Sequence, residues 1–142
     1  MASCVCFCGK ELASALPPGA KRCGSEEYWQ LCGLSASEVP CLTEHPLHCR
    51  TLLVPEGTYR PIWQAEQVVS YGLSGRSTLT LSSMGQRDLL CIQRTMTDCR
   101  GRPVEAQELR LSDSWGVFFP ADRLLLAGMW LLWAGAMPDA GK

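Results

Sequence analysis

Residues 67–111 decide the fold of this chain, and they read QVVSYGLSGRSTLTLSSMGQRDLLCIQRTMTDCRGRPVEAQELRL. Apolar and polar residues alternate in residues 78–82, where the leucines share one face and the hydroxyl side chains share the other. This period of two, with many β-branched and aliphatic residues, is typical of strands. Residues 83–87 and 98–103 carry Gly, Ser, Asp and Pro residues that favour turns. The stretch therefore predicts an antiparallel β-meander.

The chain before this stretch predicts strands that are buried on both faces. In residues 2–8 the cysteines alternate with Val5 and Phe7, so neither face of the strand is polar. Residues 51–54 form a second apolar run, and residues 21–23 suit a short strand. Strands without a polar face are typical of parallel sheets that are covered on both sides. We therefore expect a mainly parallel N-terminal part.

Short helices are expected between these strands. Residues 10–16 have apolar side chains at helical spacing and are followed by two prolines. Ser25 is a suitable N-cap, the two glutamates after it suit the first helical turn, and Gly33 is a suitable stop. The weakly periodic residues 34–47 are expected to form a loop. Together these patterns predict a single α/β domain over residues 1–142.

A closing apolar helix is expected to begin near Pro120, because proline suits the first helical position. Residues 124–137 contain no charged side chain, and Gly135 is a suitable stop. The run is shorter than the roughly 20 apolar residues of a membrane span, so no span is expected. A helix that is apolar all round is not covered by one sheet face. We therefore expect one side to pack on the meander and the other to meet a second copy or a protein partner, with Trp130 or Trp133 near that contact.

Composition narrows the classes of function. The chain has 142 residues, with 13 Lys and Arg, 14 Asp and Glu and a formal net charge of −1. Nucleic acids and anionic membranes require a basic face, which this even balance does not predict. The nine cysteines are an odd number, and no secretory leader is visible. We therefore expect a cytoplasmic protein whose cysteines are free thiols.

Cys41, His45, His48 and Cys49 are the best candidate for a metal site, because four ligand residues fall within nine positions. Their spacing, Cys-x₃-His-x₂-His-Cys, matches no standard zinc site, and adjacent His48 and Cys49 would strain one tetrahedron. We therefore interpret the histidines as loop-surface residues and the cysteines as core residues. A zinc- or thiol-dependent function of the Cys41 to Cys49 loop is the alternative.

Part of the chain resembles the central domain of the Mur-type peptide ligases. The shared order is a buried strand, the run VVSYG at residues 68–72, a β-rich excursion and an apolar helix, over residues 51–137. The family's Gly-Lys-Thr phosphate loop is missing, and residues 120–122 read PAD where the family has a His-Asn pair. The resemblance therefore implies the fold of this part without the ligase's nucleotide chemistry, and it provides no ATP-binding or catalytic residue. The segments also resemble small uncharacterised bacterial proteins of similar length.

The patterns favour a non-catalytic protein. The sequence contains neither a nucleotide-phosphate loop nor a nucleophile elbow, and no carboxylate pair suits acid–base catalysis. We therefore assign no catalytic, cofactor-binding or metal-ligating residue, and we expect no cofactor. The expected function is protein–protein association or the binding of a small ligand in the sheet crevice.

Overall fold

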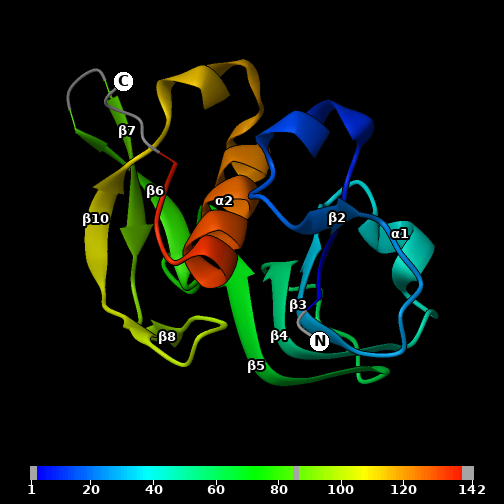
Figure 1. The fold of residues 1–142 in the computed structure, drawn as a ribbon. Coiled ribbons are helices and arrows are strands. Elements are labelled where there is room, and N and C mark those ends of the chain that lie inside the picture. Colours follow the sequence, from blue (N-terminus) through cyan, green and yellow to red (C-terminus); the bar gives the residue numbers. More distant parts are fainter. Residues whose placement is uncertain (1–2, 85–86, 139–142) are drawn as a thin grey trace.

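The computed structural model describes residues 3–84 and 87–138. In these residues one sheet of eight strands has the order β10-β7-β6-β5-β4-β3-β1-β2 (Figure 1). Strands β1 to β5 pair with their sheet neighbours in parallel. The expected α/β fold with mainly parallel N-terminal strands is therefore confirmed. The strands are β1 (Cys4–Phe7), β2 (Ala20–Arg22), β3 (Trp29–Leu34), β4 (Leu47–Pro55), β5 (Trp63–Tyr71), β6 (Leu79–Met84), β7 (Arg87–Ile92) and β10 (Gln107–Arg110).

The second part of the sheet is antiparallel, but it is not one continuous meander. β6 pairs antiparallel with β7, and β7 pairs antiparallel with β10. β6 meets β5 in parallel through the single pair Tyr71 and Leu79, because β6 continues beyond the point where β5 ends. β8 (Met96–Thr97) and β9 (Pro103–Val104) form a separate antiparallel pair. The expectation of consecutive antiparallel strands is thus wrong for the first link of the stretch.

Of the two turns expected in this stretch, the structure describes one completely and the other only in part. Between β8 and β9 the carboxylate of Asp98 accepts hydrogen bonds from the backbone N–H groups of Arg100 and Arg102, both at 2.9 Å. This contact confirms the turn expected at residues 98–103. The other turn was expected at residues 83–87, but β6 extends to Met84 and β7 begins at Arg87. Residues 85–86 lie outside the described residues.

Strands β3, β4 and β5 change face part of the way along. Residues three apart in a regular strand face opposite sides, yet Trp29 and Cys32 lie in one core cluster, as do Cys49 and Leu52. The register stays aligned across the change, since Trp29 pairs with Cys49 and Cys49 pairs with Ala65. The three strands therefore bend together, and Figure 1 shows β4 and β5 turning near their starts. Their first residues fold over the sheet and enclose a core of their own.

Two apolar cores result, one on each side of the sheet. In β1, Cys4 and Cys6 belong to the core beneath α2, whereas Val5 and Phe7 belong to the core enclosed by the bent strands. The short helix α1 (Val39–Leu42) contributes both its buried residues to this second core. The two-sided burial predicted for the first strand is confirmed, because all residues of β1 are buried and they alternate between the two cores.

α2 (Pro120–Met129) begins at the expected proline and packs on β3, β4, β5 and β6. It continues as a π-helical stretch, Trp130–Ala134, up to Gly135, whose φ of 81° is the left-handed conformation typical of a helix end. The helix lies close to the sheet at Gly128, where a Cβ atom would lie 2.6 Å from Cδ2 of Leu53. The closing helix is therefore confirmed, although it packs on the parallel strands as well as on β6.

The chain's own N-terminal segment covers part of the second side of this helix. After β1 the chain forms a 3₁₀ helix, Lys10–Ala15. The indole N–H of Trp130 donates to the carbonyl of Ala15 at 2.8 Å, and that of Trp133 donates to the carbonyl of Pro18 at 3.0 Å. The helix therefore buries much of its apolar surface without a second chain. Among the described residues, no helix is both long and apolar enough to cross a membrane.

Two local expectations are wrong. The helix expected from Ser25 to Gly33 is instead a loop followed by β3, whose residues are buried on both faces between β1 and β4. The loop expected at residues 34–47 contains α1, a helix of four residues.

Candidate functional site

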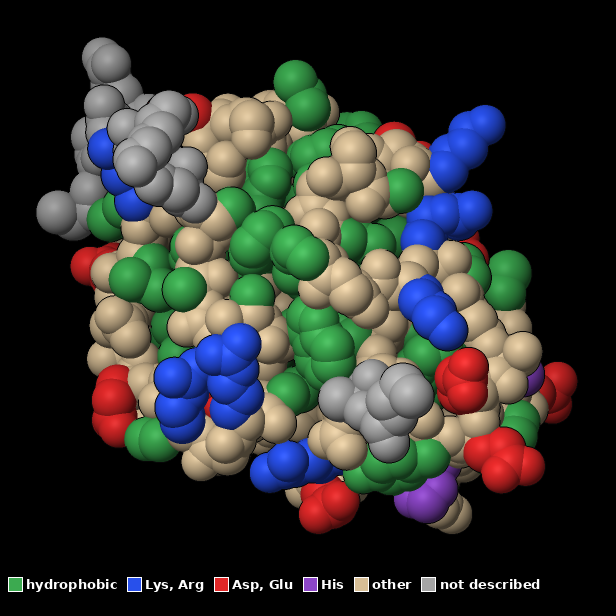
Figure 2. All heavy atoms as spheres, viewed as in Figure 1, with side chains coloured by type: hydrophobic (Ala, Val, Ile, Leu, Met, Phe, Trp, Pro, Cys, Tyr) green, Lys and Arg blue, Asp and Glu red, His purple; other side chains and the backbone are tan. Residues whose placement is uncertain are grey.

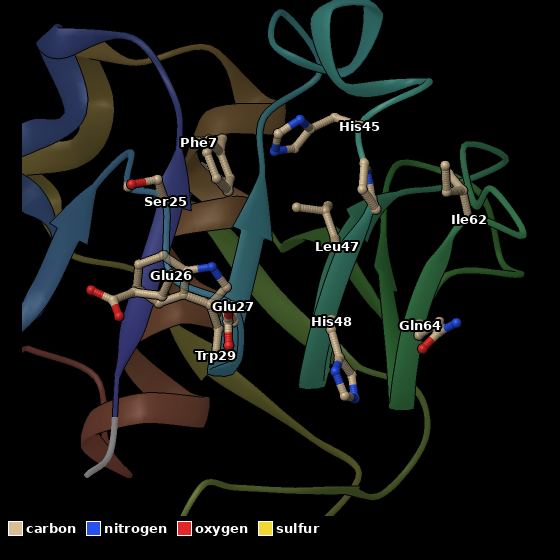
Figure 3. Close-up of a pocket in the computed structure, with 12 residues that line it drawn as sticks. Phe7, Ser25, Glu26, Glu27, Trp29, His45, Leu47, His48, Ile62 and Gln64 are labelled. Atoms are coloured by element: carbon tan, nitrogen blue, oxygen red, sulfur yellow. The ribbon is translucent and has the colours of Figure 1, made fainter.

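The structure separates the four residues of the metal candidate. Cys41 is exposed on α1, whereas Cys49 is buried in the second core. His45 and His48 are both exposed and line one hollow, but Figure 3 shows them at opposite ends of it with Leu47 between them. In the part of the chain that the structure describes, no group of three or more His, Cys, Asp or Glu side chains could hold a metal ion. A zinc-dependent function of this loop stays a prediction, and the geometry does not favour it.

The hollow that contains both histidines lies over the second core, and we name it the Trp29 pocket. Its volume is about 480 Å³, within the range of small-molecule sites. Figure 3 shows its apolar residues between the loop before β3 and the first residues of β4 and β5. The lining residues are Phe7, Gly24, Ser25, Glu26, Glu27, Trp29, His45, Pro46, Leu47, His48, Ile62 and Gln64.

The floor of the Trp29 pocket is apolar and fixed by the second core. Phe7, Trp29 and Leu47 are buried in that core. The bend of β3 and β4 turns Trp29 and Leu47 toward Phe7 at the end of β1. Gly24 lies directly on the indole, because a Cβ atom at this position would be 2.7 Å from Cη2 of Trp29. A glycine is thus required where the loop meets the ring.

The rim of the Trp29 pocket is polar and contains carboxylates but no Lys or Arg side chain. Glu26 lies 3.7 Å from Lys21, with both side chains exposed, so this ion pair is weak. Within residues 3–84 and 87–138, no hydrogen bond or ion pair involves the side chains of Glu27, His45 or Gln64. These groups are therefore available to a bound molecule.

The indole N–H of Trp29 also lacks an acceptor within the described chain. Trp29 is only 2% exposed, and its side chain lines the pocket. By contrast, the buried Trp63 donates its N–H to the carbonyl of Leu42 at 3.0 Å. Among the described residues no fully buried side-chain nitrogen or oxygen lacks a partner, so this N–H is accessible rather than sealed in the core. An acceptor atom inside the pocket would form a hydrogen bond with it, which contributes about 0.5–1.5 kcal/mol.

The cysteines form no comparable site. Only Cys23 and Cys41 are exposed, and all nine cysteines are free thiols. Hydrogen bonding between neighbouring thiols raises the pKa of Cys6 and lowers that of Cys8, but both side chains are buried. Burial raises the pKa of the Cys99 thiol to about 11. The buried thiols are closed to a substrate, whereas Cys41 is exposed. A thiol-dependent function of the Cys41 to Cys49 loop stays a prediction.

At the sheet crevice the chain's own groups form hydrogen bonds with one another. In open parallel sheets, ligands bind at the carboxyl ends of the strands where the strand order reverses, which here lies between β1 and β3. At that point Tyr71 Oη donates to the carbonyl of Leu34 at 2.7 Å, and the Ser35 N–H donates to the carbonyl of Phe7 at 2.9 Å. The side chain of Glu11 lies against Gly9. The Trp29 pocket lies elsewhere, over the face that the bent strands enclose.

Sequence reasoning identified His45 and His48 but missed the rest of the pocket. Trp29 lies within the helix expected from Ser25 to Gly33, where a loop resting on a buried indole is not expected. The sequence pattern that could have indicated the pocket is the pair of glutamates close to a glycine and two aromatic residues, in residues 24–29. Comparisons of the chain with family models, curated proteins and solved structures found no match. The resemblance to the Mur-type ligases therefore stays a prediction.

Proposed function

We propose that this protein is a non-catalytic binding protein that holds a small molecule in the Trp29 pocket. The observation that carries the proposal is the side chain of Trp29, which lines a hollow of about 480 Å³ and whose indole N–H is accessible and has no acceptor within the described chain. Small-molecule sites combine an apolar floor with a few polar groups that fix orientation. Phe7 and Leu47 supply the floor, and Glu27 and Gln64 supply polar groups.

The arrangement of the rim supports binding rather than catalysis. Acid–base and nucleophilic catalysis require side chains within hydrogen-bond reach of one another. Among the described residues, no hydrogen bond connects His45, His48 or Glu27 to another polar side chain. The ring of His48 instead packs edge-on against Tyr28, with centroids 4.9 Å apart. The rim therefore supplies recognition groups without a coupled catalytic pair.

A fragment screen observed by NMR tests the proposal. The chain has five tryptophans, so its indole N–H signals are few, and Trp29→Phe assigns the signal of Trp29. We expect at least one fragment to shift this signal saturably. Gly24→Ala should weaken that binding, because the added Cβ meets the indole, whereas Gly75→Ala adds a Cβ into open space and serves as the matched control. A broad set of fragments at millimolar concentration that leaves the Trp29 signal unchanged would overturn the proposal.

A second candidate function is association with a second copy of the chain through the face around the C-terminal helix. The observation in its favour is that Val117 is 85% exposed and Phe119 is 79% exposed, just before α2. Beside them a hollow is lined by Trp115 and Trp130, and Figure 2 shows apolar side chains over the middle of this face. Sedimentation equilibrium tests it. The double variant Val117→Ser with Phe119→Ser should dissociate an oligomer, and a monomeric wild-type protein at high concentration would rule the association out.

A further inference from the structure

We infer that the ligand of the Trp29 pocket is a small organic cation, an amine or guanidinium compound, with an apolar body and a hydrogen-bond acceptor. This inference rests on the proposed function, because it names the class of molecule that the same pocket accepts. Three features of the lining carry it: the sign of the rim charge, the aromatic floor and the indole donor.

The charge of the rim selects a cation. Glu26 and Glu27 are the charged lining residues, and Lys21, the partner of Glu26, is not part of the lining. Glu27 has no ion pair within the described residues. An anionic ligand would meet carboxylates without a cation to offset the repulsion, whereas an ammonium or guanidinium group would form a charge-assisted hydrogen bond with Glu27.

The floor of the pocket favours an organic cation over a metal ion. Phe7 and Trp29 present aromatic surface, and a cation within about 6 Å of an aromatic ring is attracted by its quadrupole. The same floor accepts an alkyl or aromatic body through apolar contact. A metal ion would require several ligands around one point, and no such group exists in the described part of the chain.

The indole donor adds the third requirement. The N–H of Trp29 lacks an acceptor within the described chain and is not fully buried, so a bound molecule gains a hydrogen bond when it places an oxygen there. Trp29 and Glu27 are two positions apart and line the same hollow. One small molecule can therefore offer a cationic group to Glu27 and an oxygen to Trp29.

A matched series of probes tests the inference with the full chain. Tyramine, N-acetyltyramine and 3-(4-hydroxyphenyl)propionate share a hydroxyphenyl body and are cationic, neutral and anionic at neutral pH. The dissociation constant of each is measured from the shift of the Trp29 indole signal. We expect tyramine to bind about tenfold more tightly than N-acetyltyramine, as for a hydrogen bond to a charged group, and the anion to bind weakest.

Two variants connect that preference to the pocket. Glu27→Gln should abolish the advantage of tyramine over N-acetyltyramine, whereas Glu108→Gln, at an exposed position on the edge strand β10, should retain it. Equal affinities for the three probes, or a preference for the anion, would refute the cation while leaving the proposed ligand site intact. If none of the probes or fragments shifts the Trp29 signal, both the inference and the proposed function fail. Retention of the advantage in Glu27→Gln would also refute the assignment of Glu27.

Discussion

Glu56 shows how one side chain fixes a loop of this fold. Its carboxylate accepts hydrogen bonds from the Ser77 hydroxyl at 2.5 Å and from the Ser74 N–H at 3.2 Å. Gly72 leaves room for this carboxylate, because a Cβ atom there would collide with Glu56 Oε1. Both hydrogen bonds lower the pKa of Glu56, and the bond from the Ser77 hydroxyl has the larger effect. Glu56 therefore connects the end of β4 to the loop between β5 and β6.

The first prediction is a pH dependence of stability that depends on Glu56. Because the folded state lowers the pKa of this carboxyl, its contribution to stability is present above the ordinary glutamate pKa and is lost as the pH falls through the lowered value. Glu56→Gln should lower Tm at pH 7, and the difference from wild type should shrink below pH 4. Thermal melts followed by circular dichroism measure this, with Glu108→Gln as the control. A constant difference across the pH range would contradict the account.

At the scale of elements, the bend of β3, β4 and β5 explains which parts of the fold the sequence could predict. The alternation in β1 and the proline at the start of α2 are local signals, and both elements were predicted. In β3 the change of face puts Trp29 and Cys32 on the same side, and a spacing of three also suits a helix. The predicted helix at residues 25–33 follows from that ambiguity. The Trp29 pocket was missed for the same reason, since its floor exists only when the strands bend.

The second prediction concerns the contact between α2 and the sheet at Gly128. Alanine is a better helix former than glycine by about 1 kcal/mol, but a Cβ atom here would lie 2.6 Å from Cδ2 of Leu53 and 3.0 Å from Cδ1 of Leu79. Gly128→Ala should therefore lower the free energy of unfolding by about 1–3 kcal/mol, as overpacked cores do. Urea unfolding measures the change. Gly116→Ala, where nothing lies within 4 Å of the added Cβ, is the control and should be nearly neutral.

The third prediction tests whether α2 belongs to the core. Leu125 is a fully buried residue of α2, and its side chain belongs to the core beneath this helix. Leu125→Ala should lower the free energy of unfolding by about 2–5 kcal/mol, because the removed side chain leaves a cavity. Val117→Ala removes an exposed side chain and should have little effect in the same urea titration. Comparable losses in both variants would show that α2 is not packed as described.

At the scale of the whole molecule, the two cores hide most of the cysteines, and the fourth prediction follows from this. Burial and neighbouring thiols raise the pKa of Cys4, Cys6 and Cys32, so these groups contain little thiolate. In native protein a disulfide reagent should react rapidly with the two exposed thiols, Cys23 and Cys41. All nine should react in denaturant. Rapid native reaction of the five buried thiols would contradict the two-core arrangement.

The central claim is that the Trp29 pocket holds a small molecule, and isotope-filtered NOE spectroscopy with unlabelled tyramine tests it most directly. The account predicts cross-peaks between the protons of tyramine and the rings of Trp29 and Phe7, which form the pocket floor. It predicts none with Val117 or Phe119, which are exposed next to α2. Cross-peaks to Val117 and Phe119 without cross-peaks to Trp29 would contradict the claim.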